Sequence, residues 1–250
     1  MILSRPFENR YILDKIPDFY ERLKSSYEDR FYRQEVLGEY LSTDTNRVYE
    51  PFSVDTHVGE VTIDKRLPLL WALDFNVDPM SSVVAQRQGD HFVVLDEIVL
   101  NRASTFQACE EFWNRFHHHP GGVVVYGDAS GQNLKTTGTT DYQIIRQFFA
   151  STPYRHADYR VPKSNPAVRE RVQLVNAKLR NAAGEVQMRI SPKCKELIKD
   201  LEQVTYKPES TVMNKDRDPK RTHLSDALGY LIWQECRTQV RFGEQTKRLL

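Results

Sequence analysis

The sequence predicts an α/β protein in which three antiparallel strands are followed by parallel strands in one mixed sheet flanked by helices. The first observation is a set of three strand-like runs, with a tight turn at Gly89-Asp90 between the last two: residues 69–75, 82–88 and 91–100. The second is the short, wholly apolar run 123–126 after a helical pattern, which is typical of a central parallel strand. Strands and helices in this order form a mixed sheet covered by helices.

Helical spacing of apolar residues predicts the covering helices. Phe106, Cys109, Phe112 and Phe116 recur at helical intervals within residues 105–118, and a Pro-Gly-Gly sequence ends the pattern. Similar patterns predict helices over residues 141–150, 168–179, 194–204 and 224–234. A hairpin near Gly184 is predicted between the second and the third of these helices.

Residues 1–65 differ in character from the rest and are predicted to be a connecting segment, with residues 66–250 forming the folded domain. They are rich in Tyr, Arg, Glu and Asp and have few continuous apolar runs. Residues 16–27 and 29–41 are predicted as short amphipathic helices, and residues 43–60 as an extended, loop-like stretch.

Composition excludes several classes of protein. The chain has 250 residues, 40% hydrophobic and 28% charged, with a net charge of +1, so any nucleic-acid surface must be local. No apolar run approaches the roughly 20 residues of a membrane span, and the N-terminus lacks the apolar core of a signal peptide. The three cysteines form no CxxC pair, which argues against a disulfide framework and suits a reducing cytoplasm.

Three aspartates occupy related places in this pattern. Asp74 lies near the end of the first strand, Asp128 directly follows the apolar strand VVVYG, and Asp226 lies in the first turn of the last helix. If the first and fourth strands are adjacent and parallel, Asp74 and Asp128 lie side by side, since neighbouring strands are roughly 4.8 Å apart. A helix packed across that end would bring Asp226 close to both.

Such a cluster predicts bound divalent cations. Carboxylates about 4 Å apart repel by on the order of 4 kcal/mol per pair at an effective dielectric constant near 20. The local sequence offers no dedicated set of arginines to neutralise them. Oxygen ligands without Cys or paired His favour Mg²⁺ or Mn²⁺ over zinc. Two such ions hydrolyse a phosphodiester by activating water and stabilising the leaving oxygen.

Each aspartate also has a structural interpretation. An Asp after a strand is often a turn residue or a helix N-cap, which applies to Asp128. The dipole of the last helix favours a negative charge in its first turn, which applies to Asp226. Asp78, before Pro79, is a weaker fourth candidate for a metal ligand, and a turn role fits it equally well. The shared order and placement of the other three favour a common site.

Beyond these residues, the chain resembles a known family. The stretches LLWALDFNVDP, VVVYGDASGQ and HLSDALGYLIW, together with the intervening residues, resemble the C-terminal nuclease domain of tailed-phage terminase large subunits over about residues 66–236. The resemblance implies a ribonuclease H-like fold with an acidic two-metal centre. In that centre Asp74 matches the first-strand acid, Asp128 the fourth-strand acid and Asp226 the acid of the C-terminal helix.

The resemblance extends to function and partners. The stretch YRQEVLGEYLSTDTNRVYEPF resembles the segment that links the packaging ATPase to the nuclease. The resemblance implies double-stranded DNA, a terminase small subunit and a portal protein as partners, in the host cell cytoplasm. No GxxxxGK[ST] loop and no Walker B strand is recognisable in these residues, so we do not expect them to translocate DNA.

Basic residues give candidate DNA contacts. Residues 155–180 hold seven Lys or Arg against two acids, and the candidates within them are Arg169, Arg171, Lys178 and Arg180. The loop before the last helix adds Lys215, Arg217, Lys220 and Arg221. A solvated helix face and a polar connector explain the same charges. His223, three residues before Asp226, could orient a water or phosphate, or could cap the helix.

Three functions are compatible with these observations. The first is a metal-dependent endonuclease that cuts double-stranded DNA during phage genome packaging. The second is a ribonuclease H-like resolvase, integrase or transposase. The third is a module that docks DNA or a portal ring without cleaving.

Overall fold

The predicted mixed α/β sheet is confirmed. The computed structural model describes residues 7, 9–39, 46–76, 78–136, 138–208, 210, 212–214 and 221–237. One sheet has the order β5-β4-β1-β2-β3-β6, with antiparallel pairs β1–β2 and β2–β3 and parallel pairs β1–β4, β4–β5 and β3–β6. The strands are β1 (Leu69–Asp74), β2 (Met80–Gln88), β3 (His91–Leu100), β4 (Val123–Gly127), β5 (Asp158–Tyr159) and β6 (Met188–Ile190).

Strand β1 lies at the centre of the sheet and is buried along its whole length. Because successive side chains of a strand point to opposite faces, β1 and β4 each contribute to two separate cores. One core contains Leu70, Ala72, Val124 and Tyr126. The other contains Leu69, Trp71, Leu73, Val123 and Val125. Both strands are almost entirely apolar because neither face meets water.

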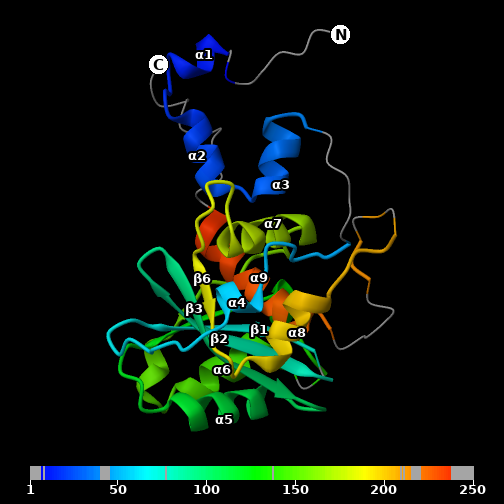
Figure 1. Ribbon diagram of the computed structural model, residues 1–250. Helices are drawn as coiled ribbons and strands as arrows, with labels where there is room; N and C mark the ends of the chain where they lie inside the picture. Colours follow the sequence, from blue (N-terminus) through cyan, green and yellow to red (C-terminus); the bar gives the residue numbers. More distant parts are fainter. Residues whose placement is uncertain are drawn as a thin grey trace.

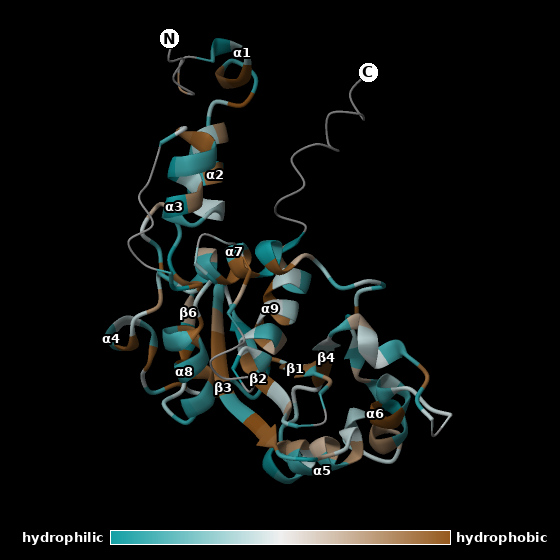
Figure 2. Cartoon of the chain, turned by 90° about the vertical axis from the view of Figure 1, so that its right-hand side faces the viewer, coloured by the Kyte–Doolittle hydropathy of each residue, from teal (hydrophilic) through white to brown (hydrophobic). Residues whose placement is uncertain are grey.

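Helices cover both faces of the sheet (Figure 1). On one face pack α7 (Val168–Leu179), α8 (Lys195–Gln203) and α9 (His223–Cys236); on the other pack α5 (Thr105–Phe116) and α6 (Asp141–Phe149). Trp71 of β1 stacks on Phe112 of α5, with ring centroids 4.3 Å apart. In Figure 2 these helices show both hydrophilic and hydrophobic residues along their length, as elements with one buried face should.

Capping explains where α5 and α6 begin. Ser104 and Thr140 each form a capping box. The hydroxyl accepts from the backbone N–H of the third helical residue, a Gln, and the side chain of that Gln accepts from the backbone N–H of the capping residue. The two short 3₁₀ helices η3 (Ala129–Gln132) and η4 (Pro153–His156) follow β4 and α6. The bounds of the longer strands and helices agree closely with the predicted ranges, but the positions of the short strands β5 and β6 were not predicted.

The N-terminal part divides into two segments. Helices α1 (Arg10–Leu13), α2 (Phe19–Ser26) and α3 (Asp29–Phe31), with the π-helix η2 (Tyr32–Val36), lie beyond α7 and away from the sheet (Figure 1). A small core of Tyr20, Leu23 and Tyr32 holds them together. The backbone N–H of Ala182 donates to the carbonyl of Tyr27 over 2.8 Å, so this segment contacts the turn after α7.

Residues 46–58 pack on the main domain. Val48, Tyr49 and Phe52 are buried in the same core as α7, α8 and α9. This stretch was predicted to be extended, and that was wrong in part because it contains the helical turn α4 (Val54–His57). Within the described ranges, no helix is long and apolar enough to cross a membrane.

Candidate active site

The ends of β1 and β4 place two of the three aspartates together. The parallel register pairs Ala72 with Tyr126 and Leu73 with Gly127, so Asp74 and Asp128 are the next residues on adjacent strands. Asp74 shares the strand face of Leu70 and Ala72, which is the face that α9 covers. The sheet therefore directs the Asp74 carboxylate toward the last helix.

The third aspartate lies in the first turn of α9. That turn is fixed from a neighbouring helix, because Asp200 of α8 accepts hydrogen bonds from the backbone N–H of Thr222 (3.2 Å) and of Ser225 (3.3 Å). Thr222 itself has a left-handed backbone, with φ of 88°, and makes no side-chain cap. Asp200 thus replaces the missing N-cap with an anion, which the helix dipole favours.

Asp74 is bound by residues from both sides of the site. Its Oδ2 lies 2.9 Å from His223 Nδ1 and also accepts from the Asn76 amide. The Asn76 Nδ2 lies 3.0 Å from the same His223 nitrogen. These three side chains connect the end of β1 to the beginning of α9, so His223 contacts the carboxylate of Asp74.

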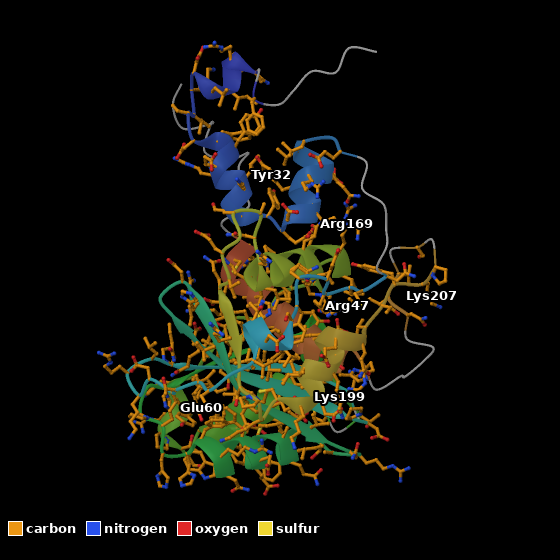
Figure 3. All side chains as sticks on the ribbon, in the orientation of Figure 1. Tyr32, Arg47, Glu60, Arg169, Lys199 and Lys207 are labelled. Atoms are coloured by element: carbon orange, nitrogen blue, oxygen red, sulfur yellow. The ribbon has the colours of Figure 1, made fainter. Side chains whose placement is uncertain are left out.

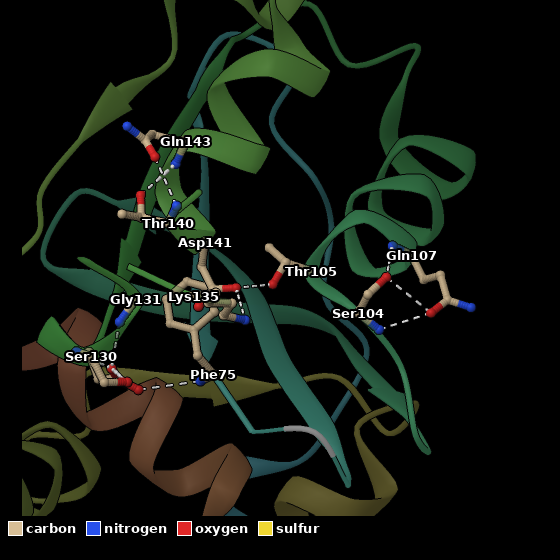
Figure 4. A network of polar contacts seen from close by, with 11 residues as sticks. Phe75, Ser104, Thr105, Gln107, Ser130, Gly131, Lys135, Thr140, Asp141 and Gln143 are labelled. Carbon is tan, nitrogen blue, oxygen red and sulfur yellow. Dashed lines mark hydrogen bonds and ion pairs between the residues drawn. The ribbon is translucent and has the colours of Figure 1, made fainter. Parts of the chain in front are cut away.

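Asp128 anchors the loop that follows β4. Its Oδ1 accepts from the backbone N–H of Ser130 (2.6 Å) and Gly131 (3.3 Å), and its Oδ2 accepts from the backbone N–H of Phe75 (3.3 Å). Figure 4 shows these contacts beside a second network, in which the Asp141 carboxylate bonds Thr105 and Lys135. The N-cap role considered for Asp128 is therefore real, and it leaves the carboxylate beside Asp74.

Asp226 is neutralised by an arginine, contrary to the expectation from the sequence. Arg171 of α7 is buried, and its Nη1 lies 2.9 Å from Asp226 Oδ1 and 3.3 Å from the Asp226 carbonyl oxygen. The expectation that no arginine compensates the acids was wrong for this one. Arg171 therefore has almost no exposed surface with which to meet a DNA phosphate.

The charges of Asp226 and Asp128 act on Asp74. Burial raises the pKa of Asp74, and the negative charges of Asp226 and Asp128 raise it further, while the hydrogen bond from His223 opposes the shift. Burial also raises the pKa of Tyr230 of α9, and all three aspartates add to that shift. The acids thus form one anionic cluster between the sheet edge and α9.

The donor chemistry of this cluster fits a hard divalent cation, because it consists of carboxylate oxygens only. As they stand, however, the described stretches bring no three His, Cys, Asp or Glu side chains into a metal-holding group. Each aspartate instead contacts other groups of the protein: Asp74 contacts His223, Asp128 accepts from backbone amides, and Asp226 pairs with Arg171.

The other predicted site residues lie in varied surroundings. Asp78 is exposed on the turn into β2, with its Oδ2 3.9 Å from Arg102 Nε. Arg169 of α7 and Arg180, the C-cap residue of that helix, are exposed. Figure 3 shows Arg169 where α7 meets the N-terminal helices, and its Nη2 lies 3.1 Å from Glu35.

Two further predicted cations are tied to neighbouring side chains. Lys178 donates to Gln187 over 2.8 Å, and the Arg221 guanidinium lies 2.9 Å from Glu196 and 3.5 Å from Asp200. The contacts of Arg221 place it in the support of α9. Lys215, Arg217 and Lys220 lie outside the described residues.

Sequence reasoning did not single out several residues of this site. Asn76 follows Asp74 by two positions, and its short polar side chain in an apolar context was the available signal. Asp200 had no such signal, because an acid in a charged helical pattern is usually exposed. Lys163 lies within the basic stretch of residues 155–180. It is exposed, and two hydrogen bonds from η3 hold the residues on either side of it. Pro162 O accepts from Gln132 Nε2, and Asn165 Oδ1 accepts from the Ala129 N–H.

Comparisons with known proteins agree with this architecture. The large terminase of a thermophilic bacteriophage matches with 15% identity and a TM-score of 0.61, over 86% of this chain and 51% of that one. The chain thus spans about half the length of that protein. The nuclease domain of the P22 large terminase matches with 12% identity and a TM-score of 0.51, over 79% of this chain and 95% of that domain. At these identities the likeness shows the fold.

The curated proteins contain no match to the chain. The family model described as terminase RNaseH-like domain matches residues 71–235, which include Asp74, Asp128 and Asp226. That span covers most of the sheet and the helices around the acidic cluster. The chain therefore belongs to the terminase RNaseH-like domain family.

Proposed function

We propose that this chain is a divalent-metal-dependent endonuclease that cleaves double-stranded DNA during phage genome packaging. The observation that supports it is the convergence of Asp74, Asp128 and Asp226 at one sheet edge, where the charges of two raise the pKa of the third. A buried anionic cluster of oxygen donors suits bound cations and phosphodiester chemistry. Membership of the terminase RNaseH-like domain family supports duplex DNA as the proposed substrate.

In this proposal the site residues have distinct tasks. Asp74, central between the other two acids, would be the ligand shared by two Mg²⁺ or Mn²⁺ ions, and Asp128 and Asp226 would each complete one site. The bound ions would activate the attacking water and stabilise the leaving oxygen. His223 and Asn76 hold the Asp74 carboxylate in place, and Phe75, Ser130 and Gly131 do the same for Asp128 through their N–H groups.

DNA would approach across exposed cations that lie near this edge. Lys163 is exposed in a loop that is hydrogen-bonded to η3, the short helix that begins directly after Asp128. The Arg102 side chain is 89% exposed on the turn after β3, close to Asp78. Contacts of such side chains with phosphates bind DNA with little dependence on sequence. Arg169 of α7, which also pairs with Glu35, and Arg180, the C-cap residue of that helix, are further exposed cations.

A plasmid-nicking assay with Mn²⁺ or Mg²⁺ tests the proposal. We expect the parent protein to relax supercoiled DNA, EDTA to stop it, and Asp74→Asn and Asp128→Asn each to lower the rate at least about 100-fold, as loss of a charged group at a reacting centre does. Asp90→Asn, in the exposed turn between β2 and β3, is the matched control and should cut like the parent.

Melting curves separate loss of chemistry from loss of fold. Asp74→Asn removes a buried charge that its neighbours repel, so the variant should melt at or above the temperature of the parent. If both Asn variants fold and still cut at the parental rate, the proposed centre is wrong.

One observation favours a second candidate, a module that binds DNA without cutting it. The Arg171–Asp226 pair supplies a permanent cation where a metal would otherwise be needed. Robust DNA binding without any metal-dependent nicking would support this candidate. Preferential cutting of branched over linear DNA would instead support a resolvase-like activity.

A further inference from the structure

We infer that Arg171 is a positioning residue for Asp226: it holds the third carboxylate in place before any metal ion binds. This inference rests on the proposed function for its biological meaning, but its physical content concerns the metal-free protein. It makes α7, which carries none of the three carboxylates, a structural part of the site.

The contacts of Arg171 are specific to this one carboxylate. Its Nη1 donates to Asp226 Oδ1 (2.9 Å) and to the Asp226 carbonyl oxygen (3.3 Å), so one nitrogen fixes both the side chain and the backbone. The side chains of Arg171 and Asp226 are only 6% and 13% exposed. Solvent therefore screens this pair much less than it screens an ion pair on the surface.

The surface of α9 is shaped to receive the guanidinium. The Arg171 Cζ lies 4.2 Å from the centroid of the Tyr230 ring, one turn beyond Asp226. Gly229 lies against the same side chain: a methyl group there would be in ordinary van der Waals contact, 3.4 Å from Arg171 Cβ and 3.5 Å from its Nη1. A planar guanidinium can stack on the ring and bond the carboxylate at once, which an ammonium cannot do in the same way.

The buried charges explain why such a residue is needed. Asp226 lies in the same anionic cluster as Asp74 and Asp128, and a buried carboxylate beside two others is costly without a counter-charge. Arg171 supplies this positive counter-charge. The consequence is that Asp226 is held in one orientation in the metal-free protein, while Asp74 and Asp128 depend on hydrogen bonds from neutral donors and His223.

A double-mutant cycle in EDTA tests the inference without DNA or metal. We expect Arg171→Met to lower the melting temperature because it leaves a buried anion, and Arg171→Lys to restore part of the loss. In an Asp226→Asn background the loss caused by Arg171→Met should be at least halved. Lys178→Met, on the same helix and bonded to Gln187, should lose the same amount in both backgrounds.

A titration with Mn²⁺ provides a second readout. If Arg171 holds Asp226 ready for a metal ion, Mn²⁺ should raise the melting temperature of Arg171→Met by less than it raises that of the parent. A purely structural arginine would leave this metal-induced shift unchanged.

The possible outcomes are distinct. Equal losses in the parental and Asp226→Asn backgrounds would overturn the inference, whatever the nicking assay shows. If Arg171→Met alone does not fold, a folded Arg171→Met/Asp226→Asn double variant supports the inference, and an unfolded one overturns it. Failure of the proposed function appears separately, as absence of metal-dependent nicking by the parent.

Discussion

His223 Nδ1 lies 2.9 Å from Asp74 Oδ2, which joins the start of the last described helix to the end of the central strand. The bond places an imidazole directly beside the buried Asp74 carboxylate. The imidazole therefore helps to hold α9 against the sheet as well as to orient Asp74.

Replacing His223 by Ala should loosen the beginning of α9 from β1. The loss of one partly buried hydrogen bond to a charged group corresponds to about 1.5–3 kcal/mol of unfolding free energy. Nicking should fall more than stability does, because Asp74 loses a group that orients it. Chemical denaturation and the nicking rate check this, with the exposed His156→Ala as control. Parental nicking by a folded His223→Ala variant would exclude His223 from the site.

Asp200 should give the protein a distinctive pH dependence. Burial raises the pKa of Asp200 to about 6 from the ordinary 3.8, despite the opposing bonds from Ser225, Thr222 and Arg221. Because the folded state binds this proton more tightly than the unfolded state does, the contribution of Asp200 to stability is complete below about pH 4. It is lost as the pH rises through about 6, and amounts to about 3 kcal/mol.

The Asp200→Asn variant should therefore lose less stability than the parent between pH 4 and pH 7. Denaturation series at several pH values measure this slope. Glu202→Gln, exposed on the same helix, should keep the parental slope. An unchanged slope in Asp200→Asn would mean that the buried carboxylate does not take up a proton in this range.

Gly131→Ala should disturb the support of Asp128. A methyl group at this position would lie 2.4 Å from a carbon of the Phe75 ring and 2.8 Å from one of the Tyr142 ring. Overpacking of this kind costs about 1–3 kcal/mol, and moving Phe75 shifts the N–H that donates to Asp128. Both the melting temperature and the nicking rate should fall. Gly59→Ala, where nothing lies within 4 Å, is the control and should leave both unchanged.

Lys163→Gln should weaken DNA binding through charge alone. Removing one phosphate contact should lower affinity several-fold at low salt and reduce the slope of log affinity against log salt by about 1. Fluorescence anisotropy with duplex DNA in EDTA measures this without cleavage. Lys193→Gln, exposed on the turn between β6 and α8, should bind like the parent. Equal salt slopes for the two variants would place the DNA elsewhere.

The sequence allowed the sheet and the strand-end acids to be predicted because both follow from local patterns. The apolar run of β1 and that of β4 each end in an aspartate, and the parallel register then places Asp74 beside Asp128. The apolar pattern of α9 is equally local. The catalytic and metal-binding roles of Asp74, Asp128 and Asp226 stay predictions.

What sequence reasoning missed depends on contacts between distant segments. Arg171 looked like one more cation in a basic stretch, and its burial depends on Asp226, Gly229 and Tyr230 of another helix. Strand β6 is three residues long and is fixed by its pairing with β3, so its own sequence carries no strand pattern. In both cases the deciding partner is remote along the chain.

The order of the acids along the chain has a consequence for synthesis. Asp74 and Asp128 leave the ribosome well before α9, which carries Asp226 and His223 and covers the central strand. Until α9 is translated, Asp74 lacks its imidazole and Arg171 lacks its counter-ion. A nascent chain therefore holds an incomplete centre. Completion of the proposed centre coincides with closure of the core.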